Sequence, residues 1–303
     1  MEGQSSKMKL TGVYNHTYLD VRKPRFNFGE IAGYPEVKEH FKDMVVVPLK
    51  HGKELTKAGI VPPSGVIVWG PLGTGKGHMI ESSADAAGVN YIIIRGRECT
   101  DHPDVIRDGF KFAVEHAPSV LHLMDIDWLA PRKDADYSWS DGTTVGKPDK
   151  FGSEDVHLAV HEEVARVAPM QDVFVLASCY RIDVLDQAFT RTSMLGRKIY
   201  VPRPGANDKI EILKYYLKDV NLSEDLNLDE IGEKIDLYVG WDIEALCRKA
   251  KLNALERKSG EVPLVNKSDF EGAMTSVSAW LTPQMADDYD RIYDEDCLHK
   301  YNF

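Results

Sequence analysis

The sequence has no long hydrophobic run. No apolar stretch approaches the roughly 20 residues that cross a bilayer, and the opening MEGQSSKMKL lacks the apolar segment of a secretory signal. These absences predict a cytoplasmic protein with no membrane partner. Basic residues are in the minority, since 37 Lys and Arg stand against 48 Asp and Glu, giving a formal charge of -11. This negative balance argues against nucleic acid as a partner.

Cysteine is also scarce. The four cysteines, Cys99, Cys179, Cys247 and Cys297, show neither CxxC pairs nor the Cys/His spacing of a metal site. The spacing therefore predicts free thiols, with no disulfide framework and no metal bound by cysteine.

What the sequence does contain is a repeated alternation of apolar runs and helical patterns. With 303 residues, of which 43% are hydrophobic, the chain can bury a large core. Short apolar runs separated by longer segments of helical spacing are typical of an α/β fold, a parallel sheet sandwiched by helices. The predicted strands are 65–70, 91–95, 119–125, 173–178 and 198–201.

The pattern changes along the chain and suggests domain boundaries. Residues 1–25 show no sustained period and are expected to form a loosely attached N-terminal arm. The α/β pattern occupies 26–205 and ends at the Arg203-Pro204-Gly205 turn. A smaller, mainly helical domain is expected over 206–282, with its clearest helix at 242–257. Within the first domain, the polar, Gly- and Asp-rich segment 134–155 predicts a long exposed loop.

A glycine-rich motif follows the apolar run VIVW and precedes a helical segment, which is the context of a phosphate-binding loop. Its backbone N–H groups and the Lys76 ammonium are expected to hold phosphate oxygens. The next residue is normally Ser or Thr, whose hydroxyl binds Mg²⁺, but here it is Gly77. The candidate cofactor-binding residues of the motif are Gly70, Pro71, Leu72, Gly73, Thr74, Gly75, Lys76 and Gly77.

Four segments in order resemble the AAA+ ATPases, in particular the valosin-containing-protein-like and proteasomal ATPases. They are the lead-in and phosphate loop (FNFGEIAGYPEV to GPLGTGKG), HAPSVLHLMDIDWLAPRK, VFVLASCYRIDVLDQAF and VGWDIEALCRKA. The resemblance covers most of residues 26–280. It implies a P-loop AAA+ module followed by a helical lid, with ATP or ADP as cofactor. The implied partners are other AAA+ subunits, in a homo- or hetero-oligomeric ring, and a protein client.

The catalytic positions depart from that family. Its Walker B strand ends in Asp-Glu, for Mg²⁺ and for activating water, whereas this chain has Met124 and Asp125 there. Asp125 is then a candidate base that is one methylene too short. Shifting the frame by one residue would make Asp125 the metal ligand but would put Ile126 at the base position. Neither alignment supplies a working pair, so no metal ligand is predicted.

Other family positions are changed as well. Tyr180 stands where the family has a sensor Asn, and Met194 replaces the first of two arginines that act on a neighbouring subunit. Arg197 matches the second, as a candidate trans-acting finger or as a surface ion pair.

The expected substrate-contacting loops also differ. The first pore loop, GRECTDHPD, contains no aromatic residue. Loop 134–155 lies near the second pore-loop position and carries Tyr137, Trp139 and Phe151. These side chains are expected either to contact a peptide or to anchor the loop on a neighbouring subunit.

The family's nucleobase contacts are altered at two places. Ile31-Ala32 match its adenine-contacting Ile-Gly, and Gly240-Trp241 match the Gly-Ala of its lid. All four are candidate cofactor-binding residues, and Trp241 is expected to crowd the adenine or ribose.

The tail 283–303 combines acidic and aromatic residues. It is expected to be flexible or ordered by a tail-binding partner, with a packed helix as the alternative.

Two functional hypotheses result. The first is a pseudo-ATPase that retains or weakens nucleotide binding, has lost hydrolysis and acts as a structural or regulatory subunit. The second is an active Mg-ATP-dependent AAA+ unfoldase. A nucleotide-free adaptor is a third class.

Overall fold

The computed structural model describes residues 19–144, 150–190, 194–258 and 264–300. Its large domain is built on one six-stranded sheet with the order β1-β3-β4-β5-β2-β6. All neighbouring strands are parallel except β1, which runs antiparallel to β3. The strands are β1 (Leu19–Arg22), β2 (Gly65–Trp69), β3 (Asn90–Arg95), β4 (Ser119–Met124), β5 (Val173–Cys179) and β6 (Arg197–Tyr200).

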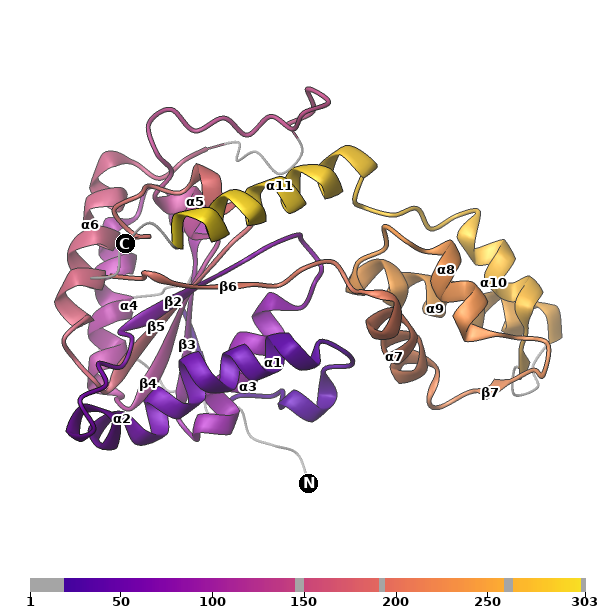
Figure 1. The fold of residues 1–303 in the computed structure, drawn as a ribbon, viewed down its shortest axis with the longest axis horizontal. Helices are drawn as coiled ribbons and strands as arrows, with labels where there is room; N and C mark the ends of the chain where they lie inside the picture. Colours follow the sequence, from indigo (N-terminus) through magenta and orange to yellow (C-terminus); the bar gives the residue numbers. More distant parts are fainter. Residues whose placement is uncertain (1–18, 145–149, 191–193, 259–263, 301–303) are drawn as a thin grey trace.

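Helices cover both faces of the sheet (Figure 1), because alternate strand residues point to opposite faces. One face packs Val66, Val68 and their neighbours against α1 and α3; the other packs Ile67, Trp69 and their neighbours against α4 and α6. The helical segments of the large domain are η1 (Phe28–Glu30), α1 (Pro35–Phe41), the π-helical η2 (Lys42–Val46), α2 (Val47–Lys57), α3 (Lys76–Ala87), η3 (Gly96–Glu98), α4 (Pro103–Glu115), α5 (Ile126–Leu129), α6 (Glu154–Val167) and η4 (Ile182–Val184).

The predicted α/β fold is confirmed. The bounds of each predicted strand agree with those of an observed strand to within one residue at either end. The apolar runs located these strands because a strand buried on both faces needs continuous hydrophobicity. The predicted loose arm is wrong at residues 19–22, which form β1 on β3. Arg22 and the backbone N–H of Arg25 bind the buried carboxylate of Glu81 at 2.7 and 2.8 Å. Residues 1–18 lie outside the described part of the chain.

A helical lid follows β6, as the family resemblance implies. It comprises α7 (Ala206–Leu217), α8 (Leu228–Lys234), α9 (Gly240–Lys258) and α10 (Lys267–Met274), with a short parallel pair of strands, β7 (Asn221–Leu222) and β8 (Leu264–Val265). In the part of the chain that the structure describes, none of the helices has the length and hydrophobicity needed to cross a bilayer.

The chain then returns to the large domain as α11 (Pro283–Lys300), which lies across it (Figure 1). Met285, Tyr289 and Ile292 are each at most 3% exposed and join the large-domain core. Lys198 of β6 forms an ion pair with Asp296. The expectation of a flexible or partner-ordered tail is therefore wrong for these residues, and the packed helix is the form observed; Tyr301–Phe303 lie outside the described residues.

Candidate functional site

The phosphate loop lies between β2 and α3, at the carboxyl edge of the sheet. Gly70, Gly73 and Gly75 have φ angles of 135°, 76° and 89°, which L side chains rarely adopt. A Cβ on Gly70 would lie 2.3 Å from the carbonyl oxygen of Val201. The loop therefore depends on glycine both for its turn and for its contact with the strand exit of β6.

Lys76 begins α3 and is turned onto its own loop. Its Nζ donates to the carbonyl oxygens of Gly70 and Pro71, at 2.7 and 2.6 Å. Loss of solvation lowers the pKa of Lys76 to about 8, while the nearby Cys179, Asp125 and Asp127 oppose the shift. A desolvated ammonium with too little negative charge around it fits the phosphates of a nucleotide.

The residues that would hold Mg²⁺ do not fit this ion. A Cβ on Gly77 would meet no atom within 4 Å, so the site has room for a hydroxyl-bearing side chain but does not have one. Met124, at the end of β4, offers a thioether where a hard cation needs oxygen. Within the described residues, no group of three or more His, Cys, Asp or Glu side chains could hold a metal.

Asp125, the candidate base, is bound to a cation of the same chain. Its Oδ2 accepts a hydrogen bond from Nε of Arg97, at 2.6 Å. The Arg97 guanidinium also lies over the ring of Trp128, 4.6 Å from its centroid. Asp125 has a φ of 56°, a left-handed conformation that few residues other than glycine adopt. Asp125 therefore combines an unusual backbone conformation with an ion pair to Arg97.

A second carboxylate, Asp127, is fully buried in the same region. Its Oδ2 accepts a hydrogen bond from the backbone N–H of Tyr180, at 3.2 Å, and its Oδ1 has no hydrogen-bond partner. Burial, and next the charge of Asp125, raise the pKa of Asp127 to about 7. The sequence reasoning missed this residue, although the acidic spacing in MDID was a visible signal.

Tyr180, at the sensor position, is part of an aromatic cluster. Its ring contacts those of Trp139, Trp280 and Tyr289, with centroids 5.6 to 6.0 Å apart. Tyr289 also donates its hydroxyl to the carbonyl oxygen of Tyr180, at 3.3 Å. The Tyr180 ring, which follows β5, thus packs against the segment that leaves the lid and against α11.

The loop predicted to be exposed is anchored within its own chain. Tyr137 and Trp139 are each 3% exposed, and Tyr137 donates to the carbonyl oxygen of Asp127 at 2.7 Å. Trp139 packs on Tyr289 with centroids 5.1 Å apart, and Phe151 packs on Tyr137 at 5.3 Å. The expectations of peptide contact or anchoring on a neighbour do not hold for Tyr137 and Trp139, because α11 and the β4 exit bury them. Residues 145–149 of this loop lie outside the described part.

Gly240 and Trp241 of the lid lie against the phosphate loop. The backbone N–H of Trp241 donates to the carbonyl oxygen of Gly73 at 3.3 Å, and a Cβ on Gly73 would lie 2.6 Å from the indole ring. Ile31 and Ala32 are partly buried on the sheet face that α1 and α3 cover.

The two finger positions differ in exposure. Met194 is 8% exposed and belongs to the core. Arg197 is exposed at the start of β6, whereas the phosphate loop follows the end of the parallel strand β2. Arg197 and Lys76 therefore lie at opposite ends of the parallel strands.

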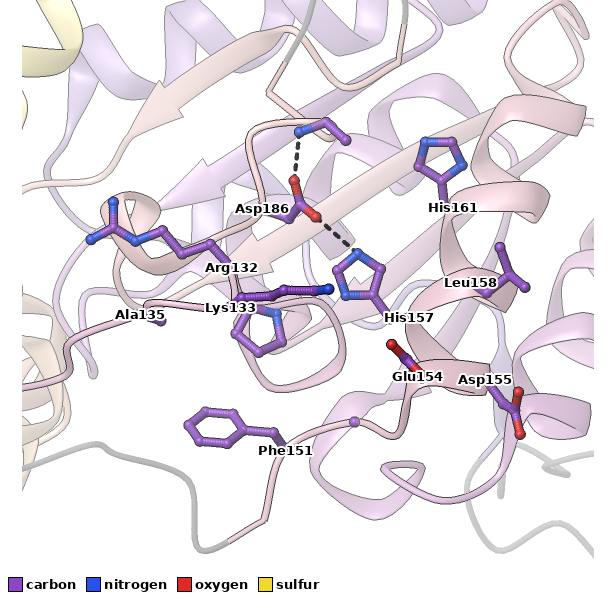
Figure 2. Close-up of a pocket in the computed structure, with 13 residues that line it drawn as sticks. Arg132, Lys133, Ala135, Phe151, Glu154, Asp155, His157, Leu158, His161 and Asp186 are labelled. Atoms are coloured by element: carbon purple, nitrogen blue, oxygen red, sulfur yellow. Dashed lines mark hydrogen bonds and ion pairs between the residues drawn. The ribbon is translucent and has the colours of Figure 1, made fainter.

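A separate cavity of about 820 Å³ lies beside α6 (Figure 2). In its lining, His157 Nε2 lies 3.0 Å from Asp186 Oδ2. No motif in the sequence indicates this cavity, because its walls come from separate segments. They comprise Pro131, Arg132, Lys133, Ala135, Phe151, Gly152, Glu154, Asp155, His157, Leu158, His161, Asp186 and Ala188.

Comparison with known proteins agrees with this architecture. Residues 66–203 match the family of ATPases associated with various cellular activities (AAA), and residues 225–272 match the AAA+ lid domain. Protein SAV of Sulfolobus acidocaldarius is 32% identical over 93% of this chain and 39% of its own length. The cell division cycle protein 48 homolog of Archaeoglobus fulgidus is 30% identical over 91% of this chain and 38% of its own.

A third relative is the proteasome-activating nucleotidase of Methanocaldococcus jannaschii, 29% identical over 84% of this chain and 58% of its own length. The chain thus spans less than two thirds of each of these relatives. The two family matches occupy consecutive parts of the chain and correspond to the sheet domain and to the lid that follows it. The chain belongs to the AAA ATPase family.

Proposed function

We propose that this chain is a pseudo-ATPase: it holds ATP or ADP on its phosphate loop and hydrolyses ATP little or not at all. It would act as a structural or regulatory subunit in the cytoplasm, in a ring with copies of itself or with other AAA subunits, on a protein client. Arg197 is the candidate residue for a neighbour's site, because it is exposed at the sheet edge away from its own phosphate loop.

Retained nucleotide binding is supported by the backbone of the loop. The glycine conformations are those of a strand-loop-helix phosphate site, and α3 directs its N-terminus toward the loop. Lys76 is the one cation in the loop sequence, and its lowered pKa indicates that an anion would stabilise its charge.

The ion pair between Asp125 and Arg97 carries the proposal that hydrolysis is lost. A general base must reach the attacking water with a free lone pair. Asp125 is shorter than the expected Glu, and its Oδ2 is already engaged at 2.6 Å. The ion pair with Arg97 competes with an attacking water for this carboxylate, which disfavours its use as a base.

The test measures hydrolysis and binding separately on the purified protein. We expect no Mg-ATP-dependent phosphate release above that of Lys76→Ala, together with saturable binding of a fluorescent ATP analogue that is nearly independent of Mg²⁺. Steady-state release that disappears in Lys76→Ala would overturn the pseudo-ATPase proposal. Absence of saturable binding would favour a nucleotide-free adaptor.

The second candidate is an active Mg-ATP-dependent unfoldase, and one observation favours it. Asp127 supplies a second carboxylate near Lys76, with an Oδ1 that has no hydrogen-bond partner. The same assay decides between the candidates, because an active enzyme would lose its phosphate release in Asp127→Asn or Asp125→Asn.

A further inference from the structure

The lid places a large side chain on the phosphate loop. The ring atoms Cγ and Cδ2 of Trp241 lie 2.6 Å from the position that a Cβ on Gly73 would take. Gly240 is equally close, since its own Cβ would lie 2.8 Å from the carbonyl oxygen of Gly73. The first turn of α9 therefore rests directly on the loop.

Several groups of the loop are engaged within the chain in this arrangement. Lys76 bonds two carbonyl oxygens of the loop, and Gly73 accepts a hydrogen bond from the backbone of Trp241. Phosphate oxygens need the N–H groups of such a loop and the lysine ammonium to face them. Lys76 therefore has to turn away from these carbonyl oxygens to bind a polyphosphate, and the indole on Gly73 lies close to where the phosphates would sit.

The indole also contacts a second tryptophan. Trp280 meets it edge to face, with centroids 6.1 Å apart. The carboxylate of Asp242 fixes this corner, accepting hydrogen bonds from the backbone N–H groups of Val239 and Trp280 at 3.0 and 3.1 Å. Trp241 itself is 44% exposed, so little packing opposes its movement.

We propose that the Trp241 indole is a displaceable cover of the phosphate loop, which polyphosphate binding moves away from Gly73. The cover rests on the proposed nucleotide binding and adds its regulation: it lowers the apparent affinity by the fraction of molecules in which the loop is open. A cover acts on the phosphates, whereas an indole that stacked on the nucleobase would act on the base. The two roles therefore predict opposite effects of removing the ring.

Calorimetric titrations of wild type and Trp241→Ala with ATP and with inorganic tripolyphosphate separate these roles. We expect Trp241→Ala to bind both ligands more tightly, each by about tenfold, because the open fraction approaches one. Leu252→Ala, which truncates another exposed side chain of α9, should leave both affinities unchanged. Trp241→Phe should give an intermediate gain and guards against a folding defect in the alanine variant.

Each outcome has a defined meaning. Weaker ATP binding by Trp241→Ala with unchanged tripolyphosphate binding would overturn the cover in favour of base stacking. Unchanged affinities for both ligands would overturn the cover while leaving nucleotide binding intact. No saturable binding to either protein would overturn the proposed function and the cover with it.

Tryptophan fluorescence gives an independent readout. The chain has five tryptophans, and displacement of Trp241 from Gly73 should change its emission when tripolyphosphate binds. The change should disappear in Trp241→Phe. Its persistence in that variant, at unaltered amplitude, would overturn the cover.

Discussion

The two walls around the phosphate loop depart from the AAA pattern to different degrees. The wall formed by β2 and α3 keeps the glycines and Lys76, so the phosphate contacts that we propose there would come mainly from the backbone. The opposite wall, at the ends of β4 and β5, has Met124, a captured Asp125 and the packed Tyr180. Backbone binding survives side-chain replacement, whereas hydrolysis depends on particular side chains.

The packed wall also supports the fold. Tyr180, Trp139 and Tyr289 form a buried aromatic group, and Tyr180 is the residue matched to the family's sensor Asn. If this wall has become structural, substitutions there should cost stability, and substitutions on the phosphate wall should cost ligand affinity.

The largest effect is expected at Tyr289, which is 1% exposed. Truncation in Tyr289→Ala should lower the free energy of unfolding by about 3–5 kcal/mol, because it removes a buried ring and leaves a cavity. Urea denaturation measures the loss. Tyr293→Ala, at a 40% exposed ring of the same helix, should cost far less. Equal costs at the two positions would contradict a structural role for the aromatic group.

The next effect is expected on the phosphate wall. Lys76→Ala should weaken ATP binding by roughly 10- to 100-fold, the value of a charge-assisted hydrogen bond of about 1.5–3 kcal/mol. Its unfolding free energy should change little. Lys111→Ala, at an exposed lysine of α4, is the matched control for charge. If both variants bind ATP like the wild type, the phosphate wall is not the binding site.

Restoring the missing metal ligands should make ATP binding depend on Mg²⁺. Gly77 has open space around its missing side chain and Met124 is only partly buried, so the double variant Gly77→Thr with Met124→Asp should fold. We expect Mg²⁺ to tighten its ATP binding by about tenfold, because two oxygen ligands return.

The wild type and the matched Gly77→Ala variant should show no such tightening by Mg²⁺. Isothermal titration with and without EDTA measures the ratio of the affinities. A wild type that already depends on Mg²⁺ would show that the metal ligands have been misassigned.

The smallest effect is a pH dependence of binding. The Lys76 pKa of about 8 means that the ammonium is charged below pH 8 and neutral above it in the free protein. Phosphate binding favours the charged form, so ATP affinity should be constant below pH 7 and fall by about tenfold at pH 9. Titrations across this range measure the slope, and Lys76→Ala should be flat. A rise in affinity above pH 8 would contradict the assignment.

The sequence predicted the parallel core well, because each buried strand is a continuous apolar run. It did not predict β1, because the four residues of this strand include Asp20 and Arg22 and form no continuous apolar run. The α11 stripe was visible as Met285, Tyr289 and Ile292 at helical spacing, but the surrounding acidic residues concealed it.

At the candidate site, the motifs located the phosphate loop and Asp125 but not their partners. Arg97 and Trp280 come from segments distant in sequence from Asp125 and Trp241, and only the tertiary fold brings each pair together. The burial of Tyr137 and Trp139 was likewise hidden, because a Gly- and Asp-rich segment favours an exposed loop unless another element covers it.

The path of the chain around the lid has one more consequence. The chain enters the lid after β6 and leaves it into α11, which is fastened to β6 through Asp296. The lid is therefore connected to the large domain at both of its ends. Both connections of the lid thus lead back to the same strand, so moving the lid far from the sheet would have to strain β6 or break the contacts of α11.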